Sequence, residues 1–249
     1  MSRIASLLFA ILAYAIFFAT FLYLIIFVGD LALGELSPKT VDNPPSQLPL
    51  GAAVIIDVAL IALFGVQHSV MARPWFKRAW TKIVPPPAER SMYVLFASLA
   101  LVIMFRFWQP IDIVIWDVGG YLLHDLVFVL FWIGWGMVLL STFLINHFEL
   151  FGLQQALFYF RGRQAEPPTF RTPFFYKWIR HPLYAGFFLA FWATPQMTAG
   201  HLLLAAGMSI YMLIAIRYEE RDLVAFHGRD YEDYRGRVGM LFPSFRSRA

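Results

Sequence analysis

Long apolar stretches are the feature that most restricts what this chain can fold into. Four of them, at residues 4–28, 50–67, 92–108 and 122–145, approach or exceed the roughly 20 apolar residues that a membrane-crossing helix needs. A backbone in lipid must satisfy its own hydrogen bonds, so such stretches form helices. With 59% hydrophobic and only 14% charged residues, the composition also differs from that of a soluble domain. We expect an all-α integral membrane helical bundle.

The first apolar stretch is either a membrane helix or a signal peptide. Its apolar run is longer than the about 7–15 residues of a signal-peptide core, and no small-residue cleavage site follows it. We therefore expect residues 4–28 to be an uncleaved first span.

The fifth apolar stretch is too long for a single crossing. A turn that contains Pro and Gly divides it into arms at residues 183–193 and 201–216. We expect a C-terminal helical hairpin, followed by a cofactor-binding tail in the cytoplasm. After four spans, such a hairpin places His181 and Glu219, which flank it, on one side of the membrane.

The distribution of charge predicts the orientation in the membrane. Residues 73–90 contain five Lys or Arg and one Glu, and residues 146–182 contain five basic and two acidic residues. Residues 29–49 and 109–125 are net acidic. Because basic loops stay in the cytoplasm, we expect both termini there, with the chain in a bacterial-type inner membrane. The net charge of +4 is then a topology signal, and no nucleic-acid partner or obligate protein partner is expected.

Several classes of chemistry are disfavoured. The chain has no Cys, which removes disulfides, thiolate metal ligands and a cysteine nucleophile. No His-x-x-x-His or Glu-x-x-His spacing is present, so we expect no metal. No Gly-rich dinucleotide loop is found either. We expect one membrane domain over residues 1–249, with a four-helix membrane part at 1–145 and a cofactor-binding part at 146–249.

Polar and aromatic residues gather on both sides of the expected hairpin. They are Arg180, His181, Pro182, Tyr184, Gly186, Glu219, Glu220, Tyr231 and Tyr234. Taken alone, Arg180 is a common interfacial anchor and Pro182 a common first residue of a helix. The two adjacent carboxylates are less ordinary, because the end of an apolar helix favours cations. They predict a compensating partner or ligand.

The order of these residues resembles a known family. R-H-P-x-Y-x-G, then E-E-x-x-L, then G-x-x-Y-x-x-Y and a closing Pro is similar to the isoprenylcysteine carboxyl methyltransferase group of integral-membrane methyltransferases. The resemblance implies S-adenosylmethionine as cofactor, with the carboxylates facing its ribose or its sulfonium. It implies that Arg180 or His181 holds the cofactor carboxylate. Aromatic faces at Tyr184, Tyr231 and Tyr234 would contact adenine or the sulfonium.

Two further blocks resemble a narrower branch. Q-H-S-V-M-A-R-P from Gln67 and N-H-F-E-L-F-G-L-Q-Q from Asn146 look like the membrane-bound methanethiol S-methyltransferases and relatives named for nitric-oxide-reductase accessory function. This resemblance implies methanethiol as acceptor and dimethyl sulfide as product, and it adds Gln155 to the cofactor site. Alternatives remain open: prenylcysteine or a lipid amine as acceptor, or a non-catalytic membrane accessory protein of nitrogen-oxide metabolism.

A thiol acceptor must lose its proton, so the chain should provide a base that accepts it. His147, with Asn146 and Glu149, follows the fourth span, and His68 lies at the end of the second. Each histidine is also explained by a hydrogen bond to a neighbouring helix at the interface. The sequence does not rank the two.

Overall fold

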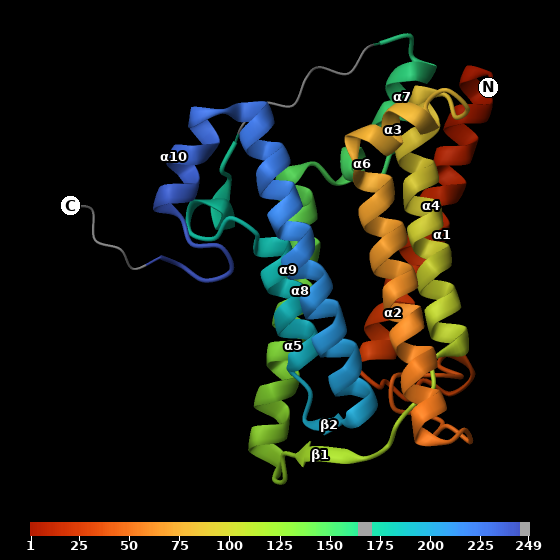
Figure 1. Ribbon diagram of the computed structural model, residues 1–249, viewed down its shortest axis with the longest axis vertical. Helices are drawn as coiled ribbons and strands as arrows, with labels where there is room; N and C mark the ends of the chain where they lie inside the picture. The colour runs from red at the N-terminus through yellow and green to blue at the C-terminus, as the bar shows by residue number, and fades with distance from the viewer. Residues whose placement is uncertain (164–170, 245–249) are drawn as a thin grey trace. The chain divides into compact units, whose positions relative to one another are not determined.

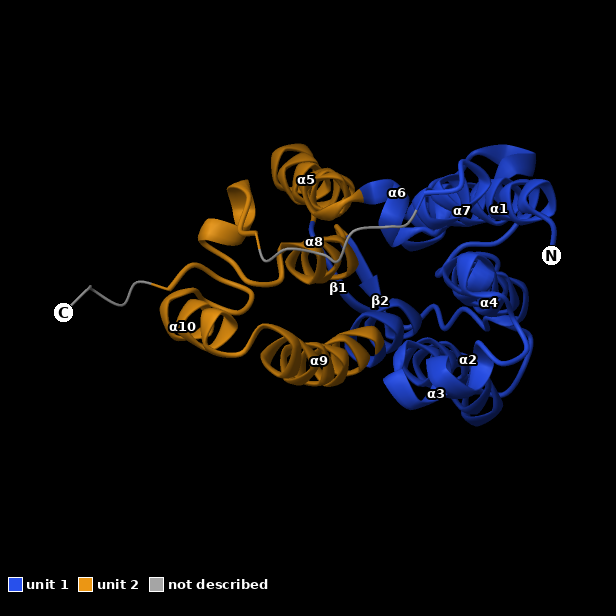
Figure 2. Ribbon diagram, turned by 90° about the horizontal axis from the view of Figure 1, so that it is seen from above, with its two compact units in different colours: residues 1–118, 147–166, 196–207 blue, residues 119–146, 167–195, 208–249 orange. Residues whose placement is uncertain are grey.

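The computed structural model describes residues 1–163 and 171–244, which fall into two compact units. Figure 2 colours the first unit, residues 1–118, 147–166 and 196–207, and the second, residues 119–146, 167–195 and 208–249. Residues 164–170, inside the long loop before the hairpin, and residues 245–249 lie outside the described part of the chain.

Helix α4 (Pro86–Phe107) is at the centre of the first unit. It packs on both α1 (Arg3–Val28) and α2 (Leu50–Ala72), and all three run nearly side by side in Figure 1. Shorter helices complete the unit: η1 (Gly34–Leu36), α3 (Pro74–Trp80), α6 (His147–Leu150) and α7 (Leu153–Phe160). Helix α7 contacts α1 and α4, which brings the chain after residue 146 onto the first helices.

The second unit is built on the contact between α5 (Tyr121–Ile145) and α8 (Pro182–Trp192). It also contains η2 (Phe174–Lys177), α10 (Arg229–Arg237) and most of α9 (Ala199–His227), whose first turns belong to the first unit. Pro182 occupies the first helical turn of α8, where its missing N–H costs nothing.

Glycines allow α5 and α8 to approach closely. A Cβ atom at Gly134 would lie 2.8 Å from the Gly186 carbonyl oxygen, and one at Gly186 would lie 2.8 Å from the Gly134 carbonyl oxygen. Ala190, one turn after Gly186, meets the same helix, since its backbone nitrogen would be 2.7 Å from the Gly134 Cβ. Small residues four apart are a common basis of helix packing in membranes. Gly186 therefore faces α5.

The expected bundle of membrane helices is confirmed. In the described part of the chain, five helices, α1, α2, α4, α5 and α9, are long and apolar enough to cross a membrane. Many of their large apolar side chains are exposed, as lipid-facing residues must be. Helix α8 has 11 residues, a length of about 16 Å, against a hydrocarbon core of about 30 Å.

The expected hairpin is present, but its second arm is longer than the sequence suggested. Helix α8 ends at Trp192 and α9 begins at Ala199, on either side of the expected turn. The expected end at residue 216 is wrong, because α9 continues to His227. No Gly or Pro occurs in residues 217–227, and the helix stops at Gly228, which has φ +58°. The two glutamates thus lie inside the helix, and the dipole argument for a ligand does not apply to them.

A short antiparallel sheet in the first unit departs from the all-α expectation. Strand β1 (Val114–Asp117) pairs with β2 (Gln196–Thr198), with Val114 opposite Thr198. Beside it, the buried Asp42 accepts a hydrogen bond from the Thr198 hydroxyl and lies 3.6 Å from His201 Nδ1. The sheet fastens the segment after α4 to the beginning of α9, and the contacts of Asp42 fasten the loop after α1 to the same place.

Candidate functional site

The segment before α8 is held by the chain that follows α10. The Arg180 backbone nitrogen donates to the Gly239 carbonyl at 2.8 Å, and that of His181 donates to the Met240 carbonyl at 3.1 Å. Ile179 and Gly239 form a parallel bridge. These bonds fix the backbone that carries the first two residues of the R-H-P motif.

Glu220 is the acceptor that organises this motif. Its Oε1 accepts a hydrogen bond from Arg180 Nε at 2.8 Å and lies 3.1 Å from His181 Nε2. Arg180 Nη1 also donates to the backbone carbonyls of Arg235 and Val238. The Glu220 side chain is 14% exposed. Its negative charge is therefore compensated by two neighbouring residues, not left for a ligand alone.

Glu219 has a different environment. Its Oε2 accepts a hydrogen bond from the Tyr184 hydroxyl at 3.0 Å, and its Oε1 lies 4.0 Å from His181 Nδ1. The side chain is 45% exposed. The two adjacent glutamates thus divide their roles: Glu220 is enclosed by the motif, and Glu219 is reachable from outside.

The two tail tyrosines are packed inside the protein. Tyr231 is 2% exposed and Tyr234 is 6% exposed, with ring centroids 5.8 Å apart. The Tyr234 hydroxyl donates to the Tyr176 carbonyl at 2.6 Å. Burial raises the pKa of Tyr234 to about 12, and it also raises the pKa of Tyr231. Both remain neutral phenols, and their expected contact with a cofactor stays a prediction.

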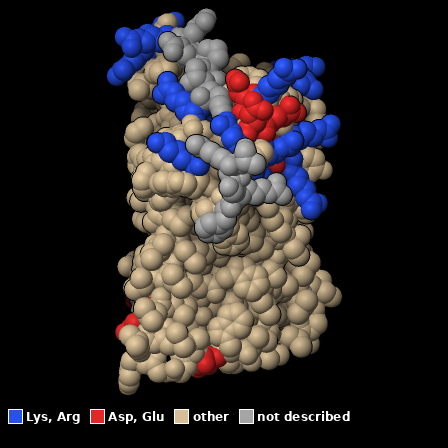
Figure 3. All heavy atoms as spheres, turned by 90° about the vertical axis from the view of Figure 1, so that its left-hand side faces the viewer, with Lys and Arg blue, Asp and Glu red and all other residues tan. Residues whose placement is uncertain are grey.

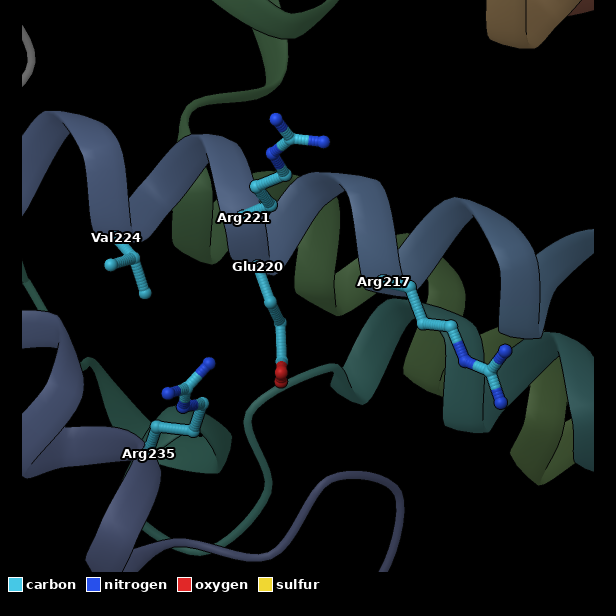
Figure 4. A pocket seen from close by; sticks show the side chains of 5 residues that line it. All are labelled: Arg217, Glu220, Arg221, Val224 and Arg235. Carbon is cyan, nitrogen blue, oxygen red and sulfur yellow. The ribbon is translucent and has the colours of Figure 1, made fainter.

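A pocket of about 350 Å³ opens beside Glu220. Figure 4 shows its lining, which consists of Arg217, Glu220, Arg221, Val224 and Arg235. Figure 3 shows that charged side chains of both signs gather at one end of this face of the molecule, while the broad surface below is almost uncharged. Of the expected cofactor residues, Glu220 lines the pocket.

The expected acceptor residues lie mostly in the first unit. His147 begins α6, is 6% exposed, and has Nε2 2.8 Å from the Tyr14 hydroxyl. Its ring lies edge-on to Phe151, with centroids 4.9 Å apart. Burial lowers the pKa of His147 below its ordinary value of 6.5. Its imidazole is therefore neutral near pH 7.

The residues around His147 contribute backbone hydrogen bonds. Asn146 ends α5 by donating its backbone N–H to the Thr142 carbonyl at 3.1 Å. The Glu149 carbonyl accepts from Gln155 Nε2 at 3.0 Å. Within residues 1–163 and 171–244, Gln155 Oε1 is buried and has no hydrogen-bond partner. A donor from outside the protein would satisfy it.

His68 is enclosed by aromatic rings. It stacks on Phe64 with centroids 5.2 Å apart and lies 4.8 Å from the ring of Tyr93. The Tyr93 hydroxyl donates to the His68 carbonyl at 3.5 Å. His68 lies on α2 and packs against Tyr93 of α4. A catalytic role for it stays a prediction.

Sequence reasoning missed the three arginines of the pocket and Tyr14. Arg217 and Arg221 lie one helical turn apart around the E-E pair, a spacing that could have drawn attention to them. Tyr14 lies 133 residues before its partner His147, so only the fold reveals that contact. In the described part of the chain, no group of three or more His, Cys, Asp or Glu is arranged to hold a metal.

Comparison with curated proteins finds methanethiol S-methyltransferases along nearly the whole chain. The sequence is 49% identical to the Crocosphaera subtropica enzyme over 243 residues, 98% of this chain and 93% of the relative. It is 48% identical to that of Mycobacterium tuberculosis, with 98% of each chain covered. Nurim of Rattus norvegicus is 30% identical over 69% of this chain and 68% of its own. No family model and no solved structure matches. The chain belongs to the methanethiol S-methyltransferase family.

Proposed function

We propose that this member of the methanethiol S-methyltransferase family transfers a methyl group from S-adenosylmethionine to methanethiol, giving dimethyl sulfide. The observation that carries the proposal is the identity of 48–49% to methyltransferases of that name over 98% of this chain. The cluster of Arg180, His181 and Glu220 supports it, because these residues form one hydrogen-bonded group although 40 positions separate the first from the last.

Within this site, we assign the contact with the cofactor to Glu219. A carboxylate accepts hydrogen bonds from ribose hydroxyls and attracts a sulfonium cation. Glu219 is exposed enough to do either, and Tyr184 holds one of its oxygens. Glu220 instead keeps Arg180 and His181 in place, so its contribution to binding is indirect.

When bound, S-adenosylmethionine supplies a methyl group on a positively charged sulfur. The protein must orient the acceptor sulfur in line with that methyl and receive the thiol proton. His147 suits the second task, because its lowered pKa leaves the imidazole neutral and able to accept a proton near pH 7. The Tyr14 hydroxyl, 2.8 Å from Nε2, holds the imidazole ring in its orientation.

The membrane orientation is part of the proposal. Both termini face the cytoplasm of a bacterial-type inner membrane, where a water-soluble cofactor reaches the tail. The chain has no Cys, so single introduced cysteines can be labelled from one side without background. A cysteine near the C-terminus and one in residues 109–125 should label from opposite sides.

The direct test is a transfer assay. Purified full-length protein in nanodiscs is incubated with methyl-labelled S-adenosylmethionine and methanethiol, and the headspace is analysed for labelled dimethyl sulfide. Parallel reactions contain prenylcysteine or a phospholipid amine in place of methanethiol. Label in dimethyl sulfide supports the proposal. Transfer only to prenylcysteine or to the lipid amine would reassign the acceptor, and cofactor binding without transfer to any acceptor would point to a non-catalytic role.

A further inference from the structure

The pocket beside Glu220 is lined mainly by basic residues. Three of its five lining residues are arginines, Arg217, Arg221 and Arg235, and one is acidic. That acid already accepts hydrogen bonds from Arg180 and His181. The pocket therefore carries an excess of positive charge that Glu220 does not cancel.

Two of the three arginines come from different helices and flank the Glu220 carboxylate. In Figure 4, Arg217 from α9 and Arg235 from α10 lie on either side of the Glu220 side chain, whereas Arg221 extends to the other side of α9. The Arg235 carbonyl accepts from Arg180 Nη1 at 3.1 Å, which anchors the start of that side chain to the R-H-P motif. Its guanidinium is thus presented from a fixed backbone.

Among the ion pairs formed within residues 1–163 and 171–244, none includes Arg217, Arg221 or Arg235. Arg217 and Arg221 stand four residues apart on one helix, where like charges repel. An arrangement of this kind favours a bound anion, and Arg is the side chain best shaped to hold a carboxylate or phosphate through two hydrogen bonds.

We infer that Arg217 and Arg235, which flank Glu220, form an anion-binding site that takes the carboxylate at the amino-acid end of the methyl donor. The inference rests on the proposed function, since that function supplies the donor. It moves the carboxylate contact away from Arg180 and His181, whose Nε, Nη1 and Nε2 atoms already contact Glu220 and backbone carbonyls. Arg235, with its fixed backbone, is the principal contact.

Decarboxylated S-adenosylmethionine, which lacks only the carboxylate, provides the test. Binding of both donors is measured calorimetrically with full-length wild-type, Arg235→Gln and Arg217→Gln proteins in nanodiscs of zwitterionic lipid. Arg235→Gln should weaken binding of the intact donor on the order of tenfold, because a charge-assisted hydrogen bond is lost. Binding of the decarboxylated donor should not change. Arg237→Gln, on the same helix α10 but outside the pocket, is the matched control and should bind both donors as wild type does.

Three outcomes overturn the inference. An equal loss for both donors would give the arginines a structural role, and no loss for either would remove them from the binding site. If nanodiscs containing phosphatidylglycerol reduce donor affinity in wild type but not in Arg235→Gln, while the two donors bind alike, the anion is a lipid phosphate. If S-adenosylmethionine is not the cofactor, wild-type protein would bind neither donor, and that result would count against the proposed function itself.

Discussion

Two histidines in this molecule are placed in opposite kinds of surroundings. His181, in the second unit, lies between the carboxylates of Glu220 and Glu219, at 3.1 and 4.0 Å. His147, in the first unit, is enclosed by the rings of Tyr14 and Phe151. The ion-paired cluster suits recognition of a charged cofactor, because its charges are held in position before the ligand arrives. The aromatic surroundings keep an imidazole neutral, which suits proton transfer. On the proposed function, the first environment serves the charged cofactor and the second serves the thiol proton.

Replacement of His147 is expected to have the largest effect. His147→Ala should lower turnover by about 10² to 10⁴, the range of a lost general base, and leave cofactor affinity nearly intact. Dimethyl sulfide formation and calorimetry measure the two quantities separately. A thiol of lower pKa should recover part of the rate, because it ionises without help. If His147→Ala keeps full turnover with methanethiol near pH 7, His147 only packs against its aromatic neighbours. His68 is then the next candidate for the base.

Loss of Glu220 should affect stability as well as binding. Glu220→Ala leaves the nearly buried Arg180 without its carboxylate, which is expected to cost about 3–5 kcal/mol of unfolding free energy. Cofactor affinity should fall with it. Glu219→Gln is the matched variant: it should weaken cofactor binding with little change in the apparent Tm, because Glu219 is half-exposed. If both variants unfold at the same temperature as wild type, the distinction between the two glutamates is wrong.

The ion-paired cluster also depends on the packing of α8 beneath it. Gly186→Ala would bring a Cβ atom within 2.8 Å of the Gly134 carbonyl oxygen, so we expect a loss of about 1–3 kcal/mol. Gly136→Ala on α5 is the control, since a Cβ there meets no atom within 4 Å. It should be neutral or stabilising by up to about 1 kcal/mol, because Ala favours the helix. Thermal unfolding in detergent compares the two, and equal Tm values would contradict the packing assignment.

The smallest expected effect concerns Tyr14 and pH. Because burial lowers the pKa of His147, the acid limb of kcat/KM should fall below the ordinary histidine value of 6.5. Turnover should therefore persist as pH drops through 6.5 and fail only below it. Tyr14→Phe removes the hydrogen bond to Nε2 and should lower kcat several-fold while moving this limb. An unchanged pH profile in Tyr14→Phe would mean that Tyr14 only packs against the ring.

The sequence predicted the helices well because hydrophobicity alone decides which segments can enter lipid. The family resemblance is confirmed by the relatives, and it rested on residues that share local motifs. The end of α9 was missed because polar residues such as Glu219 were taken to end a helix, although nothing in their conformational preference does so. The short sheet was missed since β1 and β2 are about 80 residues apart and each is too short to show a pattern.

Within the site, the sequence identified residues but not their partners. The motif names both glutamates, yet only the geometry shows that Glu220 is paired with Arg180 and that Glu219 is accessible. Tyr231 and Tyr234 were expected to offer their faces to a ligand, but each is almost fully covered by protein. Which residues pair and which are buried depends on packing between segments that are distant in the sequence, and local motifs do not show that packing.

The close approach of α5 and α8 affects how the R-H-P-x-Y-x-G motif should be interpreted in a newly found sequence. Its glycine has a structural reason of its own, since any side chain at Gly186 would collide with backbone whether or not a reaction takes place. A descendant that had lost transferase activity would keep Gly186 and would be free to lose Glu219. On the proposed role of Glu219 as the cofactor contact, that glutamate and not Gly186 is the residue by which a genome survey should separate working enzymes from relatives that kept only the architecture.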